Sequence, residues 1–99
     1  MLDFYSIKDH QPTPSFPEKL ELQFVGDLDD KTFGNLQNKN IIEEKFYYYS
    51  DFRWNTAEIK MIHQNILKHQ LQKDIEVQKL IKILEVADKE KSGLIAYGD

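Results

Sequence analysis

Residues 54–66 read WNTAEIKMIHQNI, and this stretch decides the fold because it marks both the start of a helix and the face that the helix buries. Asn55 can accept a hydrogen bond from the backbone N–H of Glu58, and the Glu58 side chain can accept one from the Asn55 N–H, which makes a capping box. Trp54 and Ile59 occupy the two positions of a hydrophobic staple. Isoleucines recur at positions 59, 62 and 66, on one side of the helix. The stretch predicts an amphipathic helix packed on an apolar layer.

A second helix is predicted where residues 74–86 read DIEVQKLIKILEV, with Asp74 as its N-cap. Its apolar positions are Val77, Leu80, Ile81 and Leu84, widened by Ile83 and Val86. Residues 71–73 contain neither Gly nor Pro, so two separate helices and one long kinked helix both fit the sequence. Gly93 is the expected C-cap of this second helix.

Shorter apolar runs predict strands. Residues 4–7 are β-prone, residues 41–49 are β-branched and then aromatic, and residues 94–97 suit a final edge strand. Apolar and polar residues alternate in residues 20–25, so Leu20, Leu22 and Phe24 are expected to face the core. Gly26 is expected to end that strand.

Two connecting segments complete the expected fold. Asp29 or Asp30 can cap a short helix that runs to about residue 38 and buries Phe33 and Leu36. Three prolines in residues 11–17 exclude a helix or an interior strand there, which predicts an extended surface loop. The expected order is β-β-α-β-α-α-β. In a single domain over residues 1–99, this order predicts an α+β fold with a small, mostly antiparallel sheet of three to four strands packed against two longer helices and one short helix.

Composition and charge exclude several classes of function. With 13 basic and 17 acidic residues the net charge is −4, which disfavours nucleic acid as a ligand and favours a basic protein partner. The chain has no cysteine, so disulfides and thiolate zinc sites are excluded. No apolar run has the roughly 20 residues that cross a bilayer, and residues 1–5 lack the pattern of a signal peptide. We therefore expect a cytoplasmic protein that does not bind membranes.

The most unusual segment is residues 46–54, FYYYSDFRW, which is dominated by aromatic residues. On a strand, Phe46 and Tyr48 would point to one side and Tyr47 and Tyr49 to the other, so that one pair fills the core. Tyr, Trp and Arg dominate binding hot spots because they combine a large rigid area with a polar group. The candidate anchors for a protein partner are Tyr47, Tyr49, Arg53 and Trp54. The alternative is that both faces are covered and that these side chains are structural.

Acidic residues supply the expected charged rim around these anchors. They are Asp27, Asp29, Asp30, Glu43 and Glu44. For the aspartates, the simpler interpretation is that they cap the helix that follows. The two glutamates are adjacent on the predicted strand and would point to opposite faces, an arrangement poorly suited to paired acid–base catalysis. For Arg53, an ion pair with Asp51 or Glu58 is the favoured alternative to a partner carboxylate.

Residues 88–99, DKEKSGLIAYGD, resemble an EF-hand calcium loop. Oxygen-bearing side chains stand at loop positions one, three, five and twelve, which are Asp88, Glu90, Ser92 and Asp99. Position three is Glu and position twelve is Asp rather than a bidentate Glu, so no metal or other cofactor is predicted. A calcium-responsive element remains an alternative function. The competing interpretation is a charged last helical turn, a glycine cap and a strand.

No catalytic pattern is recognisable in the sequence. His63 and His69 are six residues apart and do not share a helical face for metal binding. Phosphate-binding glycine loops and nucleophile elbows are also lacking. We expect a binding protein rather than an enzyme, with a small ligand-binding domain or an enzyme without a recognisable motif as a further alternative.

In size, acidity, lack of cysteine and abundance of Tyr, Asp and Glu, the chain resembles small bacterial toxin-immunity proteins. The likeness is one of composition over the whole chain and rests on no specific motif. It implies a protein that inhibits a basic toxin or nuclease by covering its active site with an acidic face. We expect the chain itself to be a monomer or a weak homodimer.

Overall fold

The structure, a computed structural model, describes residues 1–15 and 21–98. Within these residues the elements follow the predicted order β-β-α-β-α-α-β. Their bounds are β1 (Leu2–Ile7), β2 (Phe24–Leu28), α1 (Asp30–Asn38), β3 (Phe52–Trp54), α2 (Thr56–Lys68), α3 (Ile75–Glu90) and β4 (Gly93–Tyr97). The strands form an antiparallel sheet with the order β2-β1-β4-β3, so the fold class is α+β, as predicted. None of the helices described has both the length and the apolar composition needed to cross a bilayer.

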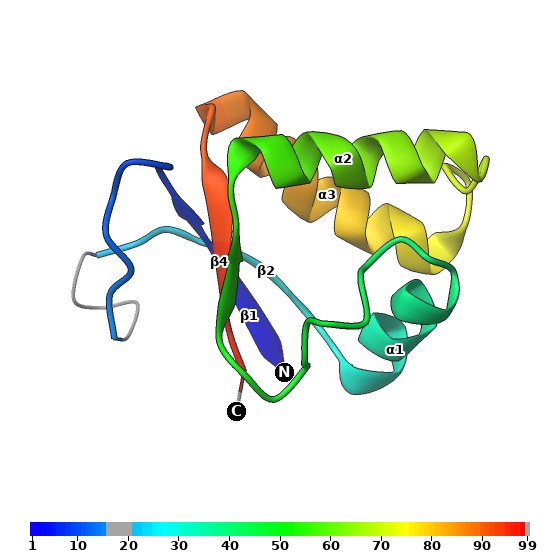
Figure 1. The fold of residues 1–99 in the computed structure, drawn as a ribbon, viewed down its shortest axis with the longest axis horizontal. Coiled ribbons are helices and arrows are strands. Elements are labelled where there is room, and N and C mark those ends of the chain that lie inside the picture. Colours follow the sequence, from blue (N-terminus) through cyan, green and yellow to red (C-terminus); the bar gives the residue numbers. More distant parts are fainter. Residues whose placement is uncertain (16–20, 99) are drawn as a thin grey trace.

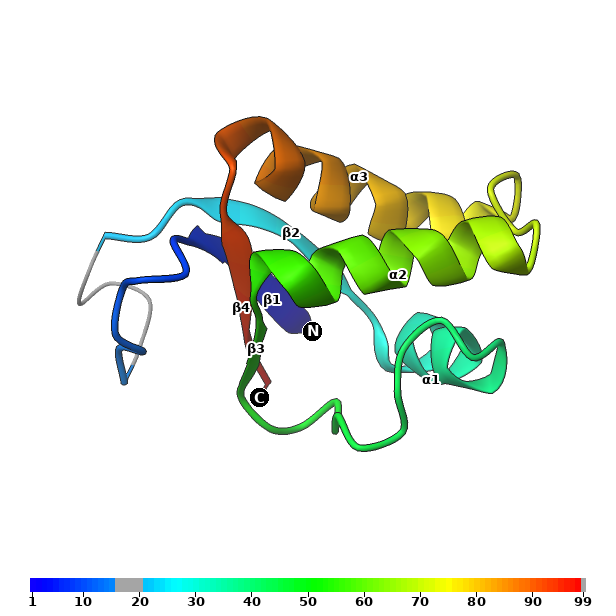
Figure 2. The same cartoon turned by 45° about the horizontal axis from the view of Figure 1, so that its top comes forward.

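The helices lie on one face of the sheet, and the described parts of the connection between β1 and β2 lie on the other side (Figures 1 and 2). Helices α2 and α3 run side by side, and α1 packs against α3. The helices α1, α2 and α3 have 9, 13 and 16 residues. Residues 41–51 connect α1 to β3 along the lower margin of Figure 1. This connection therefore lies at the edge of both layers.

The core lies between the sheet and the helices. Buried side chains of the strands include Leu2, Phe4, Leu28, Trp54, Leu94 and Ala96, and those of the helices include Phe33, Leu36, Ile59, Ile62, Ile66, Val77, Leu80, Ile83, Leu84 and Ala87. The predicted stripe of α2 is confirmed, and in α3 the predicted residues Ile81 and Val86 are half-buried at the margin of the stripe. Each fully buried aliphatic side chain contributes about 1.5–3 kcal/mol.

The predicted helix starts are confirmed. The Asn55 side chain accepts a hydrogen bond from the N–H of Glu58 at 2.8 Å, and Glu58 Oε1 accepts one from the N–H of Asn55 at 3.1 Å. At the starts of α1 and α3, the side chain of Asp29 accepts a hydrogen bond from the N–H of Thr32, and that of Asp74 accepts from the N–H groups of Glu76 and Val77. Residues 69–74 reverse the chain with Gln70 at φ 56°, so α2 and α3 are separate helices rather than one kinked helix.

The end of α3 differs from the prediction. Lys91, and not Gly93, takes the left-handed conformation that ends the helix, with φ 53°. Gly93 begins β4, which passes so close to β3 that a Cβ at this position would lie 2.4 Å from the carbonyl oxygen of Trp54. Strand β4 lies between β1 and β3, so it is an interior strand and not the predicted edge strand.

Residues 41–49 form turns instead of the predicted strand, and the strand in this region is confined to Phe52–Trp54. The N–H groups of Ile41 and Ile42 both donate to the carbonyl oxygen of Leu36 at the end of α1, at 3.0 and 3.3 Å. Both isoleucines are buried in the core from this turn. Tertiary packing therefore overrides their preference for a strand.

Strand β2 is displaced from the predicted residues 20–25 to Phe24–Leu28, and its orientation is different. Phe24 is 51% exposed and does not face the core, while Leu20 lies outside the described residues. Gly26 does not end the strand. It lies so close to α3 that a Cβ would come within 3.0 Å of Ile83. The glycine therefore allows the close approach of strand and helix.

The described part of the proline-rich segment, residues 11–15, lies against the helix-free face of the sheet (Figure 1). Pro14 is buried, and its carbonyl oxygen accepts a hydrogen bond from the hydroxyl of Tyr97 in β4 at 3.1 Å. This part of the predicted surface loop is therefore packed onto the sheet, and residues 16–17 lie outside the described residues.

Candidate functional site

The aromatic segment 46–54 divides between the core and the surface. Phe46 is half-buried, with its ring centre 5.0 Å from that of Phe52, and Tyr48 is buried. Tyr47 and Tyr49 point outward, with 63% and 52% of their surface exposed. Buried and exposed side chains therefore alternate over residues 46–49, as expected for a strand, although the backbone forms turns. Two of the four candidate anchors lie at the surface.

Tyr49 contacts both the ring of Tyr47 and Asp30, the first residue of α1. The two ring centres are 5.7 Å apart, and the Tyr49 hydroxyl donates a hydrogen bond to Asp30 Oδ2 at 3.2 Å. We call these three residues the tyrosine surface. The hydrogen bond to the carboxylate, together with its negative charge, raises the pKa of the Tyr49 phenol above its ordinary value. The phenol therefore stays neutral, and its position is set by a contact to another element.

The turn that carries the tyrosines is held from two sides. The backbone N–H and the hydroxyl of Ser50 both donate to the carbonyl oxygen of Tyr47, at 3.1 and 2.9 Å. Gly98 lies against the same turn, where a Cβ would be 2.5 Å from the carbonyl oxygen of Tyr48. The N–H of Gly98 also donates to Asp51 Oδ1 at 3.1 Å. A surface held in this way loses little conformational entropy on binding.

The five acidic candidates are all exposed, and Asp30 is the one whose side chain bonds to Tyr49 in the described part of the chain. Asp29 accepts a backbone hydrogen bond from α1 at 2.7 Å, which lowers its pKa, so the capping interpretation is confirmed for this residue. Asp27 lies in β2. Glu43 and Glu44 lie in the turns between α1 and the tyrosines. The structure therefore distributes these carboxylates over β2, the start of α1 and the connection from α1 to β3.

Trp54 is not at this surface. Its side chain is 1% exposed, because it packs in the core with its ring centre 5.5, 5.9 and 5.4 Å from those of Phe4, Phe46 and Phe52. A side chain this deeply buried cannot project into a partner surface, which corrects the assignment of Trp54 as an anchor.

Arg53 is also structural. It lies between two core-facing residues of β3, so its side chain points to the helix-free face of the sheet. The guanidinium donates to the carbonyl oxygens of Lys8 and Gln11, at 3.0 and 2.8 Å, and to Thr13 Oγ1 at 3.0 Å. The intrachain role is therefore correct, but the partners are those of residues 8–13 and not the expected Asp51 or Glu58.

Residues 88–98, which resemble a calcium loop in sequence, form the end of α3 and the strand β4. Asp88 and Glu90 lie in the last turn of α3, where side chains two residues apart point in roughly opposite directions. Asp88 Oδ2 instead lies 2.7 Å from Nε2 of His63 in α2. Ser92 is buried, and Asp99 lies outside the described residues. Among the residues described, no three His, Asp or Glu side chains are grouped to hold a metal ion.

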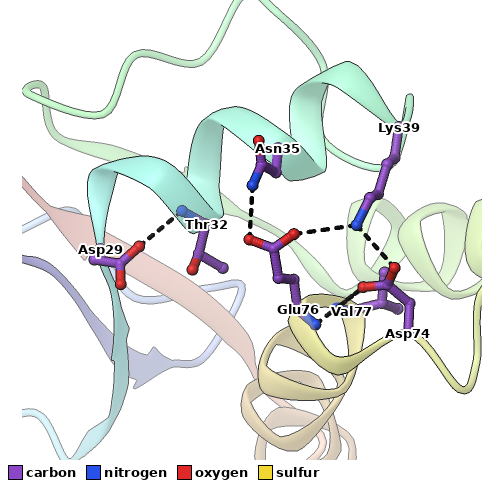
Figure 3. A network of polar contacts seen from close by, with 7 residues as sticks. All are labelled: Asp29, Thr32, Asn35, Lys39, Asp74, Glu76 and Val77. Atoms are coloured by element: carbon purple, nitrogen blue, oxygen red, sulfur yellow. Dashed lines mark hydrogen bonds and ion pairs between the residues drawn. The ribbon is translucent and has the colours of Figure 1, made fainter.

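A polar network joins α1 to the start of α3 (Figure 3). Lys39 Nζ lies 2.8 Å from Asp74 Oδ2 and 3.1 Å from Glu76 Oε1, and the Asn35 amide donates to Glu76 Oε2 at 2.8 Å. The bond to Asp74 raises the pKa of Lys39, the bond to Lys39 lowers that of Asp74, and the bond from Asn35 lowers that of Glu76. Each of these side chains has a hydrogen-bond or ion-pair partner within the network, so the network has a structural role. It holds α1, and with it Asp30, in position.

A pocket beside residues 41–46 was not predicted from the sequence. Its floor includes the buried residues Ile42, Trp54 and Ile62, and its rim includes Glu43, Glu58 and Met61. The capping box does place Glu58 in the first turn of α2. However, Glu43 and Glu58 line the same pocket only because of the path that the chain takes after α1. The sequence contains no local signal for that path.

Comparisons of the chain with protein-family models, with curated proteins and with solved structures found no match. Function is therefore inferred from the geometry and charge of the described surface.

Proposed function

We propose that the chain is a protein-binding module that captures a basic protein through the tyrosine surface and the acidic residues near it. The observation that carries this proposal is the exposed pair Tyr47 and Tyr49, held beside Asp30. Phe46 and Tyr48 fill the neighbouring part of the core, so the exposed pair is not needed there. Large side chains fixed in solvent are typical of an interface.

The tyrosine pair has the chemistry of an interface centre. Each ring offers a large rigid area at a small cost in conformational entropy, and each hydroxyl is a hydrogen-bonding group. The face of an aromatic ring also attracts the cationic group of Lys or Arg. Tyr47 and Tyr49 therefore suit a partner surface that carries basic side chains.

Charge supports the same choice of partner. The chain has a net charge of −4, and Glu43 and Glu44 are exposed in the connection that carries the tyrosines. Opposite potentials increase the association rate and fix the orientation of the complex. The specific case that we propose is an immunity-type inhibitor of a basic toxin or nuclease, which the resemblance in composition supports. Such a protein acts by binding and not by catalysis.

The proposal is tested by affinity capture on the immobilised protein from its native lysate, followed by measurement of affinity with the purified captured protein. We expect the wild type to retain a basic protein that is released at high salt, because screening weakens electrostatic association. The double variant Tyr47→Ala/Tyr49→Ala should bind it at least about tenfold more weakly, since hot-spot tyrosines each contribute more than about 1 kcal/mol.

Phe24→Ala is the matched control, because Phe24 is an exposed aromatic residue of β2 whose ring packs against Tyr5 instead of the tyrosine surface. Thermal denaturation of each variant shows whether it is folded. Undiminished capture by the folded double variant would contradict the proposal. An acidic captured protein, or the same loss of affinity in the Phe24 variant, would also contradict it.

A further inference from the structure

The pocket beside residues 41–46 has an apolar floor and a charged rim. Ile42, Trp54 and Ile62 are buried at the floor, whereas Met61 on the rim is 59% exposed. The free volume is about 30 Å³. This exceeds the ~10–15 Å³ that one water needs and is far below the ~150 Å³ of a cavity that binds benzene. The pocket therefore suits one narrow side chain rather than a ring.

Two carboxylates stand on this rim and come from different elements. Glu43 lies in the turn after α1, and Glu58 lies in the first turn of α2. Glu58 uses Oε1 to accept the backbone hydrogen bond of the capping box. No Lys or Arg is among the residues that line the pocket. The walls are therefore mostly apolar, with Asn65 as a neutral polar residue, and the charged side chains that line the pocket are both carboxylates.

The rim already binds an ammonium group of the chain itself. Lys45 Nζ lies 3.7 Å from Glu43 Oε2 and 5.2 Å from the ring centre of Phe46, which also lines the pocket. The side chains of Lys45 and Glu43 are each 64% exposed. An exposed pair of this kind contributes little to stability, so an incoming basic side chain can replace it at small cost.

The Trp54 side chain lies at the floor of the pocket. Its Nε1 is buried and has no hydrogen-bond acceptor among residues 1–15 and 21–98. A buried donor without an acceptor is unfavourable.

From these observations we infer that the pocket receives one lysine or arginine side chain of the basic partner, so the inference rests on the proposed function and names its subsite. The methylene groups of such a side chain pack against the apolar wall while its charged end stays at the mouth. There the charge meets Glu43 and Glu58, and it lies near the ring of Phe46 as Lys45 does. Residues 41–49 then present the pocket and the tyrosines to the same partner.

The test uses the single tryptophan of the chain, whose indole N–H gives one signal in a ¹⁵N-labelled sample. The probe is N-acetyl-lysine-N-methylamide, and the matched uncharged probe is N-acetyl-norleucine-N-methylamide. We expect a saturable shift of the Trp54 signal with the lysine probe and a weaker response to the norleucine probe. Glu43→Gln should weaken lysine binding roughly two- to fivefold. Lys45→Ala should strengthen it, because the competing ammonium is removed.

Glu85→Gln is the control, since Glu85 is an exposed glutamate of α3 that does not line the pocket. The inference is overturned if the lysine probe gives no saturable shift, if norleucine binds equally well, or if Glu43→Gln behaves as Glu85→Gln does. Weaker lysine binding after Lys45→Ala also overturns it. The titration needs no partner protein. If the titration fails while the wild type still captures a basic protein, only the assignment of the pocket is wrong. If capture fails while the titration succeeds, the proposed partner is wrong, but the pocket still prefers a basic side chain.

Discussion

Lys39 and Asp74 join the end of α1 to the start of α3, with 2.8 Å between Nζ and Oδ2 (Figure 3). Lys39 is the C-cap of α1 and Asp74 is the N-cap of α3. The second oxygen of Asp74 accepts hydrogen bonds from the backbone N–H groups of Glu76 and Val77, at 2.9 and 3.1 Å. One carboxylate therefore caps a helix and also positions α1, the helix that begins with Asp30 of the tyrosine surface.

Replacing Asp74 separates these two roles. Asp74→Ala removes the cap and the ion pair, and we expect a loss of about 1–2 kcal/mol in the free energy of unfolding and a fall in Tm of roughly 5–15 °C. Asp74→Asn keeps an acceptor for the cap and should cost less. Thermal and urea denaturation measure both variants. Equal losses for Ala and Asn would show that the cap contributes nothing.

The network predicts a loss of stability in acid. The pKa values of Asp74 and Glu76 are below their ordinary range, so their contribution is present above the unfolded-state values near pH 4 and is lost as pH falls through the folded-state values. The pKa of Lys39 is raised, so its contribution is present at and below its ordinary value and is lost as pH rises through the folded-state value. The stability difference between wild type and Lys39→Met should therefore be largest near neutral pH and shrink below about pH 4.

Urea denaturation of both proteins at a series of pH values measures this difference. A difference that stays constant from neutral pH to pH 3 would contradict the role assigned to the ion pairs.

Replacing Gly98 and Gly34 with alanine should change the stability of the protein in opposite directions. Gly98→Ala places a Cβ 2.5 Å from the carbonyl oxygen of Tyr48, so the turn must move and we expect both lower stability and weaker capture through the tyrosine surface. Gly34 lies inside α1 with no atom within 4 Å of an added Cβ, so Gly34→Ala should raise stability by about 0.5–1 kcal/mol. Thermal denaturation compares the two variants. Unchanged stability of Gly98→Ala would contradict the close approach.

Arg53 should matter for stability and not for capture. Arg53→Ala removes the guanidinium that holds residues 8–13, and we expect a loss of roughly 1–3 kcal/mol and faster amide hydrogen exchange in residues 8–15. Arg53→Lys keeps the charge but lacks the planar fork, so it should restore little of the protection. Weaker binding of the captured protein by the folded Arg53→Ala variant would place Arg53 in the interface instead.

Local signals in the sequence were sufficient to predict the three helices. The caps at Asp29, Asn55 and Asp74 and the apolar stripes of α2 and α3 all agree with the structure. The reason is that these signals act between residues within a few positions of one another, so a short window contains both partners. The same local alternation correctly separated Tyr47 and Tyr49 from Phe46 and Tyr48.

Tertiary structure alone decided which strands pair, where residues 41–51 run and which candidate anchors are exposed. Tyr49 bonds to Asp30 across 19 positions, and Arg53 bonds to Gln11 across 42. Ile41 and Ile42 have the composition of a strand, but they are buried from a turn at the end of α1. The physical reason is competition for a limited core, since the chain buries those apolar runs that pack together best. That choice depends on partners far along the chain and is absent from any local pattern.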